Sequence, residues 1–412
     1  MAEAAAPNTY STRVTKILER TNLPEEALAN PHHIRKGKDG PIVRFKNPYP
    51  SYHPPQPLKH IILPRLKGEI KPPDTTPPTV PVQKPEWLGG RFTGTDKIRA
   101  TWLGHACYYV EFPSGLRVLF DPVFEDCCSP WPVSLIGPRR FTPRPCDLAD
   151  IPAIDAVVIS HSHYDHLSYP SVTEIKKLHP KAHFFVGLGL EKWFRAQGID
   201  NVTELDWWED ADLTVHVPVT EGKTGGGGDD AQGQEAEEGE AKEVTARLSC
   251  LPCQHTSRRT PWDEDTTLWC SWAVSTGGKS VWFGGDTGYR STLSVPPGVT
   301  DDYGPEYESL PRCPQFRQIG EHRGPFDLGL IPIGAYYPRI AFSGMHANPY
   351  DSVEIFRDTG CRRAMGVHWG TWALTMEEVL EPPRVLKEAL GRRGIAETGV
   401  FDVCDIGESR EF

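Results

Sequence analysis

The chain has 412 residues, of which 38% are hydrophobic and 24% are charged, and its formal net charge is −11. This composition is ordinary for a globular protein with one large domain or two small ones, and the acidic balance argues against general nucleic-acid binding. No apolar run reaches the roughly 18 residues of a membrane-spanning helix, and no signal peptide is evident. The ten Cys show no framework spacing, so we expect free thiols in a reducing, intracellular compartment.

Residues 1–96 form a Pro-rich arm with little periodicity, apart from a short helix expected over residues 12–20. Between residues 32 and 71 the arm carries nine Lys or Arg against two acids, interleaved with Pro and aromatic residues. One interpretation is a surface that contacts anionic lipid, at about 1 kcal/mol per basic residue near a membrane. The alternative is an arm that wraps the core with its charges solvated, and the sequence leaves both open.

Three strand-like runs follow at residues 97–103, 107–112 and 117–121, with His105 in a turn between the first two. We expect His105 to be structural. Residues 127–141 form an apolar, Pro-containing loop that ends in two Arg and a Phe. If exposed, this loop would be an apolar patch beside cations, which suits a lipid surface; if buried, it would only cap the fold.

The most informative stretch runs from the apolar residues 156–159 into His161, His163, Asp165 and His166. The β-branched run predicts a buried strand, and its end is where open α/β sheets place their sites. Side chains two residues apart in extended backbone point the same way, so His161 and His163 can bind one ion. Asp165 and His166 follow where the chain turns and can face a second ion. Three of the 15 His in the chain lie here, which argues against a chance cluster.

Three further ligand candidates each stand at the end of a strand-like run: His255, Asp286 and His368. Imidazole and carboxylate ligands suit zinc or iron, and a catalytic zinc usually takes three protein ligands plus water. Because ligand types recur at four strand ends, the sequence predicts one dinuclear metal centre.

Strand blocks in both halves, with helices outside them, predict an α/β fold of two stacked sheets flanked by helices. The remaining strands are expected over residues 182–186, 213–217, 244–252, 268–276, 279–285, 327–333 and 363–367, and the helices over 171–178, 189–197, 349–359 and 376–391. Asn348-Pro349 and Gly360 suit the start and end of one helix, and Thr375 with Glu378 forms a capping box for the last. Residues 221–243 are Gly-rich and acidic, so we expect a flexible insertion.

The ligand pattern as a whole resembles the metallo-β-lactamase superfamily. Further segments narrow this resemblance to the N-acylphosphatidylethanolamine-hydrolysing phospholipase D family: Trp102-Leu103-Gly104-His105-Ala106, Leu205-Asp206-Trp207-Trp208-Glu209, Gly285-Asp286-Thr287-Gly288-Tyr289, Ile331-Pro332-Ile333-Gly334-Ala335-Tyr336 and His368-Trp369-Gly370-Thr371. The superfamily implies an αββα sandwich of two mixed β-sheets, here over residues 97–412, with the arm at 1–96 before it.

The family also implies a role for each site residue. Two Zn²⁺ are expected per chain, the first held by His161, His163 and His255, the second by Asp165, His166 and His368, with Asp286 bridging both. Asp165, Asp286 and His346 are the predicted catalytic residues, and Tyr164 and His346 the predicted substrate contacts. Two such cations neutralise a phosphodiester and lower the pKa of water toward ~7, so no side-chain nucleophile is needed.

The resemblance thus implies a dinuclear zinc phosphodiesterase of phospholipase D type, which hydrolyses N-acylphosphatidylethanolamine to N-acylethanolamine and phosphatidic acid. Its partner would be a membrane phospholipid, contacted by an intracellular protein that is peripheral to a membrane or cytoplasmic, and the family suggests a homodimer. The alternative is a hydrolase of the same fold that acts on a soluble phosphoester or lactone. The basic arm and the apolar loop argue against that alternative.

Overall fold

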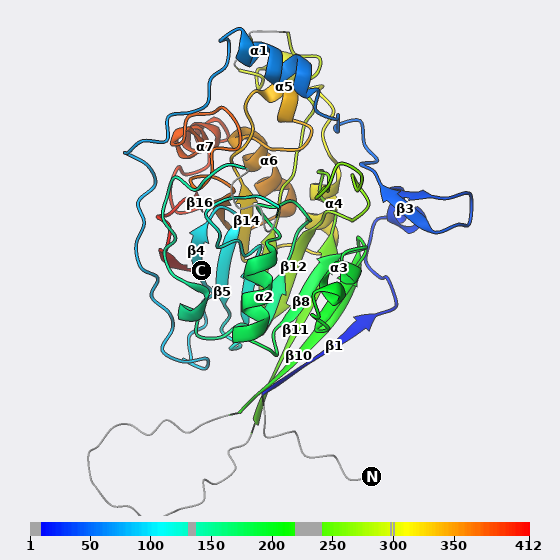
Figure 1. Ribbon diagram of the computed structural model, residues 1–412, viewed down its shortest axis with the longest axis vertical. Coiled ribbons are helices and arrows are strands. Elements are labelled where there is room, and N and C mark those ends of the chain that lie inside the picture. Colours follow the sequence, from blue (N-terminus) through cyan, green and yellow to red (C-terminus); the bar gives the residue numbers. More distant parts are fainter. Residues whose placement is uncertain (1–9, 131–136, 219–240, 297–298, 300) are drawn as a thin grey trace, which may run out of the picture.

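Two β-sheets lie face to face, with helices on both outer sides, in the computed structural model, which describes residues 10–130, 137–218, 241–296, 299 and 301–412 (Figure 1). Each sheet combines antiparallel and parallel strand pairs. The predicted α/β sandwich of two mixed sheets flanked by helices is therefore confirmed.

The larger sheet has eight strands in the order β1-β10-β11-β12-β13-β14-β15-β16. The pairs from β13 to β16 are parallel, and the others are antiparallel. The strands are β1 (Ser11–Ile17), β10 (Glu209–Pro218), β11 (Ala241–Leu251), β12 (Ser271–Thr276), β13 (Lys279–Phe283), β14 (Leu328–Pro332), β15 (Arg363–Val367) and β16 (Phe401–Asp402).

The smaller sheet has seven strands in the order β17-β4-β5-β6-β7-β8-β9, and the pairs from β6 to β9 are parallel. Its strands are β4 (Arg99–Gly104), β5 (Cys107–Glu111), β6 (Arg117–Phe120), β7 (Ala156–Val158), β8 (His183–Gly187), β9 (Val202–Leu205) and β17 (Ser409–Glu411). Parallel strands bring their carboxyl ends to one edge, and this edge receives the site residues.

Successive hydrophobic side chains of the smaller sheet face opposite sides and belong to two different cores. In β6, Val118 and Phe120 belong to the core between the sheets, whereas Leu119 packs into the core beneath α2 and α3. In β7, Val158 faces the first core and Val157 the second. This alternation is the period of two that extended backbone imposes, and it explains why both faces of these short strands are apolar.

The helices cover the two outer faces. α2 (Tyr169–Leu178) and α3 (Glu191–Ala196) lie on the smaller sheet, and α6 (Pro349–Thr359) packs against β14 of the larger one, between α4 (Gln315–His322) and α7 (Glu381–Arg392). Asn348 caps α6 by accepting the Asp351 N–H, and Gly360 ends it at φ 67°, as predicted. Short helical turns complete the fold: η1 (Glu25–Ala29), η3 (Leu148–Asp150), η4 (Pro305–Tyr307) and α5 (Arg339–Phe342).

The N-terminal arm is more ordered than the sequence predicts. The helix expected over residues 12–20 is wrong, because β1 pairs with β10 along seven residues and extends the larger sheet (Figure 1). The arm then forms a projecting hairpin of β2 (His33–Arg35) and β3 (Ile42–Phe45), and a helical turn η2 (Leu58–Ile62) that continues into α1 (Leu63–Leu66). The division at residue 96 into an arm and a catalytic domain stays a prediction.

Several other expectations need correction. α7 begins at Glu381 after Leu380, without a side-chain cap, so the capping box is wrong: the Thr375 hydroxyl donates to Glu377 instead. Residues 241–243 belong to β11, so the predicted insertion extends too far, and its residues 221–240 lie outside the described residues. Residues 131–136 of the apolar loop lie outside them too. Among the described residues, no helix combines the length and apolar character needed to cross a bilayer.

Candidate metal centre

The predicted ligands meet at one edge of the sandwich, because each follows the end of a strand. β7 leads to His161, β11 to His255, β13 to Asp286 and β15 to His368. The backbone bends sharply there: His368 has φ 64°, and Gly285 has φ 58°. A Cβ on Gly285 would lie 2.6 Å from the Ser160 Cβ, so glycine is required where the β13 end passes the histidine-rich loop.

Three imidazoles form a first cluster. His163 Nδ1 lies 2.8 Å from His161 Nε2 and 3.2 Å from His255 Nε2, so the three rings point at one place. His161 and His255 are buried, and His163 is partly buried. This set, within 4.8 Å, is the first predicted ligand group, and it could hold one metal ion.

A second cluster surrounds the Asp165 carboxylate. Its Oδ2 lies 3.0 Å from His105 Nε2, 3.3 Å from His166 Nε2 and 3.4 Å from His368 Nε2. The structure thus brings together Asp165, His166 and His368 as predicted. His105, for which we expected a structural role, lies in the same cluster.

Asp286 lies between the two clusters. Its Oδ1 is 3.0 Å from His368 Nε2 and its Oδ2 is 3.2 Å from His166 Nε2, both in the second cluster. The same Oδ2 is 3.7 Å from His255 Nε2 and 4.0 Å from His161 Nε2, both in the first. One carboxylate therefore faces both groups, which is the position required of a bridging ligand.

Unsatisfied polar atoms indicate that this centre fits metal ions. His166 Nε2 and Asp286 Oδ1 are buried and have no partner with hydrogen-bond geometry among the described residues, although atoms of the other ligands lie 3.0–3.2 Å away. A buried polar atom without a partner costs about 1–3 kcal/mol, and such atoms are rare in folded proteins. Imidazole nitrogens and carboxylate oxygens in this number are the ligands of zinc and related ions. The residues present therefore fit two metal ions.

The carboxylate Asp121 orients two of the imidazoles. Its Oδ2 accepts from His166 Nδ1 at 2.6 Å and from the Ser160 hydroxyl at 2.5 Å, and this hydroxyl lies 2.9 Å from His161 Nδ1. A proton held on His166 Nδ1 leaves Nε2 free to bind a metal, and such carboxylate–histidine pairs commonly support metal sites. The sequence predicted Asp121 only as the last residue of a strand over 117–121, although it directly follows β6, as the ligands follow their strands.

The electrostatics of the second cluster favour positive charge, whereas burial and neighbouring imidazoles hold the pKa values of His161 and His255 in the first cluster well below their ordinary value. Burial alone would raise the pKa of Asp286, yet His166 and His368 hold that pKa well below its ordinary value. Burial disfavours the charged form of His368, but Asp286 and Asp165 raise its pKa to about 9. Protons on histidine thus supply the charge that bound cations would otherwise provide, so metal binding should release protons.

His346 and Tyr164 occupy different places. His346 Nδ1 is buried without a hydrogen-bond partner among the described residues, and it lies 4.0 Å from Asp286 Oδ2. Burial lowers the pKa of His346 to about 4, so its imidazole is neutral at pH 7. The Tyr164 hydroxyl donates to the Arg259 carbonyl at 2.9 Å, and its ring packs under the Arg259 guanidinium. His346 therefore lies beside the metal ligands, whereas the Tyr164 hydroxyl is bonded to the backbone of Arg259. The substrate contacts of both residues stay predictions.

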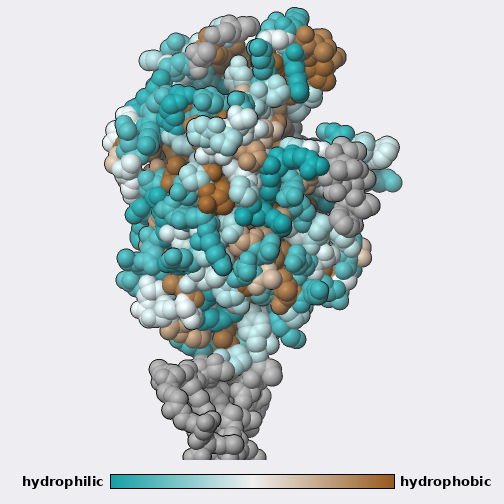
Figure 2. All heavy atoms as spheres, turned by 60° about the vertical axis from the view of Figure 1, so that its left-hand side comes forward, coloured by the Kyte–Doolittle hydropathy of each residue, from teal (hydrophilic) through white to brown (hydrophobic). Residues whose placement is uncertain are grey.

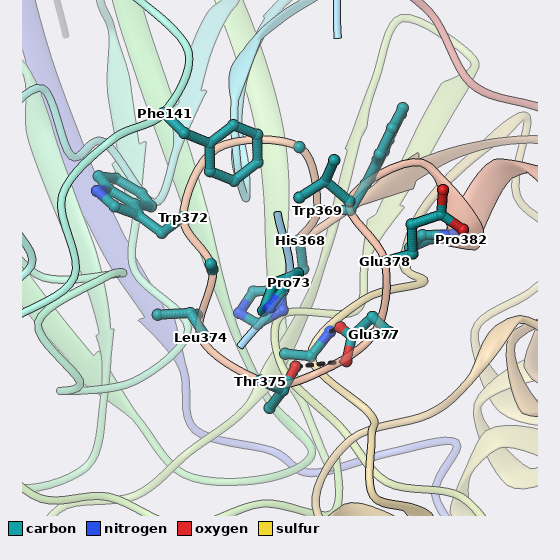
Figure 3. Close-up of a pocket in the computed structure, with 14 residues that line it drawn as sticks. Pro73, Phe141, His368, Trp369, Trp372, Leu374, Thr375, Glu377, Glu378 and Pro382 are labelled. Atoms are coloured by element: carbon teal, nitrogen blue, oxygen red, sulfur yellow. Dashed lines mark hydrogen bonds between the residues drawn. The ribbon is translucent and has the colours of Figure 1, made fainter. Parts of the chain in front are cut away.

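A small hollow of about 30 Å³ opens beside His368 (Figure 3). Phe141, Trp372 and Leu374 surround the imidazole in this view, while Glu377 and Thr375 form the opposite wall. The Glu377 carboxylate accepts the backbone N–H groups of Ala335 and Tyr337, which fixes the loop around the pocket. The hollow has room for a water molecule, and its partly apolar wall adjoins the ligand position of His368.

The N-terminal arm reaches the centre from outside. The Asn47 amide donates to the His255 carbonyl at 2.7 Å, and the Ser51 hydroxyl donates to Gln254 at 2.5 Å. A Cβ on Gly344 would lie 2.6 Å from the His53 carbonyl, so the arm also presses on the loop that carries His346. Of the two interpretations of the arm, wrapping the core is therefore observed for these residues.

Comparisons with known proteins find relatives over most of the chain. A family model described as a beta-lactamase superfamily domain matches residues 116–369. The chain is 36% identical over 323 residues to the N-acyl-phosphatidylethanolamine-hydrolyzing phospholipase D 1 of Caenorhabditis elegans, covering 77% of this chain and 76% of that protein. It is 30% identical over 289 residues to the mitochondrial enzyme of the same description in Saccharomyces cerevisiae, covering 70% of this chain and 50% of that one. A solved metallo hydrolase of Ignicoccus hospitalis aligns with 77% of this chain and 98% of its own, at 18% identity and a TM-score of 0.47.

Proposed function

Because the chain belongs to the metallo-β-lactamase superfamily, and within it to the N-acylphosphatidylethanolamine-hydrolysing phospholipase D family, its activity is that of a metal-dependent hydrolase, and we propose that it is a dinuclear zinc phosphodiesterase. The proposed reaction converts N-acylphosphatidylethanolamine and water to N-acylethanolamine and phosphatidic acid. The observation that carries the proposal is the place of Asp286 between two groups of imidazole and carboxylate ligands.

The proposed ligand assignment follows the two clusters. His161, His163 and His255 hold one ion, Asp165, His166 and His368 hold the other, and Asp286 faces both. When bound, the zinc pair supplies Lewis acidity toward the phosphate oxygens and acidifies the attacking water. In the reaction an oxygen from water bonds to phosphorus, the P–O bond to the ethanolamine oxygen breaks, and that oxygen leaves with a proton as the alcohol.

His346 is the proposed contact for the reacting phosphodiester. Its neutral imidazole carries one N–H donor and stacks beside His368 with the ring centroids 5.4 Å apart. A neutral donor can hydrogen-bond a phosphate oxygen or the departing oxygen without adding a third permanent charge to the centre. The loop that carries it is held by Arg339, whose guanidinium pairs with Asp351 at 2.7 Å.

A membrane contact is proposed for η2 and α1, which we call the docking helix. Four of its apolar side chains are exposed, and basic side chains lie among them or directly after them: Leu58 64%, Ile62 47%, Leu63 44% and Leu66 78%, with Lys59, Arg65 and, just after α1, Lys67. Hydrophobic side chains gather beside hydrophilic ones at the end of the molecule where Figure 1 places α1 (Figure 2). Apolar and basic residues together suit the boundary of an anionic bilayer.

The place of the docking helix supports a lipid substrate. η2 contacts α5, and α5 leads within four residues to His346. A bilayer that bound the docking helix would therefore lie on the same side of the protein as the loop that carries His346. An enzyme that acts on a soluble substrate would not need four exposed apolar side chains at this place.

The substrate class is tested by incubating the purified chain with N-acylphosphatidylethanolamine vesicles and, separately, with a soluble phosphodiester. We expect release of N-acylethanolamine and phosphatidic acid from the vesicles, and loss of this release after chelation, with recovery on adding zinc. Turnover confined to the soluble diester would contradict the lipid assignment and favour the alternative hydrolase.

The membrane contact is tested separately by vesicle cosedimentation. Leu66→Asp should weaken binding to vesicles that contain anionic phospholipid, because it places a charge where an apolar side chain enters the interface. Leu18→Asp is the matched control, since Leu18 is 93% exposed but lies after β1, outside the docking helix. Equal binding by both variants would contradict the docking helix without affecting the hydrolase assignment.

A further inference from the structure

The turn between β4 and β5 carries a residue that touches the second ligand cluster in several ways. His105 is buried at φ 51°, and its Nε2 lies 3.0 Å from Asp165 Oδ2. We propose that His105 is a positioning residue, which fixes two ligands of the second ion. Its ring donates a hydrogen bond to Asp165, and its backbone anchors the backbone of His368.

The backbone of His105 secures His368. Its carbonyl accepts the His368 N–H at 2.9 Å and the Trp102 indole N–H at 2.9 Å. Its own N–H donates to the Thr371 hydroxyl at 2.7 Å. The turn between β4 and β5 therefore contacts both chain segments that supply ligands to the second ion: the loop of Asp165 and the loop after β15.

The ring of His105 acts as a donor and not as a further ligand. Nδ1 is buried without a hydrogen-bond partner among the described residues, so a proton placed there would have no acceptor. A proton on Nε2 instead has the Asp165 carboxylate 3.0 Å away. Once Nε2 carries this proton it has no lone pair for a metal, whereas it prevents the carboxylate from rotating away from His166 and His368.

Metal affinity tests this inference directly, and the inference rests on the dinuclear centre proposed above. Asparagine tolerates a positive φ, so His105→Asn keeps the turn but withdraws the donor from Asp165. Glutamine places an amide near the former Nε2, so His105→Gln keeps a donor. His183→Asn is the matched control, because His183 is partly buried and bonded to Thr203 in the same sheet, away from both clusters.

We expect competition with a zinc chelator to show about 10–100-fold weaker binding of one of the two ions in His105→Asn, and wild-type binding of the other. His105→Gln should recover most of the loss, and His183→Asn should bind both ions as the wild type does. Wild-type affinity for both ions in His105→Asn would overturn the inference, as would an equal loss in His105→Gln. Fewer than two ions in the wild type would instead overturn the dinuclear centre itself.

Discussion

Two clusters of histidine and aspartate in this protein have the same composition but different hydrogen bonding. One is the metal centre, and the other, which we call the arm clamp, consists of His32 and His33 of the arm and Asp206 after β9. In the arm clamp, His32 Nε2 and His33 Nε2 each lie 2.7 Å from a different oxygen of Asp206, and the Trp207 N–H donates to Oδ1 at 2.8 Å.

The difference lies in which polar atoms remain free. Both oxygens of Asp206 are occupied by donors, and the Arg35 guanidinium lies 3.4 Å from His33 Nδ1, so the proton of that ring belongs on Nε2 toward Asp206. His32 Nδ1 has no partner among the described residues, but the carboxylate of the arm clamp is satisfied, whereas in the metal centre the shared carboxylate keeps Asp286 Oδ1 without a partner, as does His166 Nε2. A shared carboxylate whose two oxygens are both occupied by donors suits a structural clamp, and one that keeps an unmatched oxygen among imidazoles suits a metal site.

Replacing the shared carboxylate of the metal centre gives the largest expected effect. Asp286→Asn should lower turnover of N-acylphosphatidylethanolamine by roughly 10³-fold or more, because one ligand of both ions is weakened, and 10³-fold equals about 4 kcal/mol of barrier. Steady-state kinetics measure the loss, and circular dichroism checks that the fold persists. Turnover within tenfold of the wild type would refute a bridging role.

The ligands could be predicted because each follows an apolar run that must be buried. His161, His255, Asp286 and His368 stand directly after such runs, and parallel strands collect their ends at one edge. The strand blocks of both halves were predictable for the same reason. A local pattern therefore determines both where the strands lie and which polar residues meet.

The residues that support the ligands could not be predicted in this way. Asp121 and His105 belong to turns whose partners are distant in the chain, and only the packing of two sheets shows that these side chains face His166 and Asp165. The conformation of β1 could not be predicted for the same reason. Its sequence Ser11–Ile17 has two basic residues and a weak pattern, and its strand conformation depends on pairing with β10, about 200 residues later.

The number of bound ions per chain distinguishes the metal centre from the arm clamp. The wild type should contain two zinc ions per chain by mass spectrometry, and Asp206→Asn should contain the same two. Chelation should lower the melting temperature by several degrees, because ions that bind only the folded state stabilise it by up to about 4 kcal/mol at 1,000 times the dissociation constant. Three ions in the wild type and two in Asp206→Asn would show that the arm clamp binds metal.

Breaking the arm clamp should reduce stability without removing metal. Asp206→Asn leaves two histidines with a neutral acceptor in place of a buried carboxylate, which costs about 1–3 kcal/mol. Urea unfolding monitored by tryptophan fluorescence measures this loss, and Asp212→Asn is a control at an exposed ion pair with Arg247. Equal stabilities of the two variants would show that the arm does not depend on the clamp.

The smallest expected effect is the pH dependence of the arm clamp. Burial lowers the pKa of His32 below 6.5, so protonation favours the unfolded chain, and this contribution to stability is lost as the pH falls below about 6.5. Burial would raise the pKa of Asp206, but hydrogen bonds from His32 and His33 hold it below its ordinary value, so its contribution is present above about pH 4 and lost as the pH falls further. His32→Gln keeps a donor toward Asp206 but cannot titrate. Between pH 7.5 and pH 5 the wild type should therefore lose more free energy of unfolding than His32→Gln, and parallel losses would show that His32 is not held neutral by the fold.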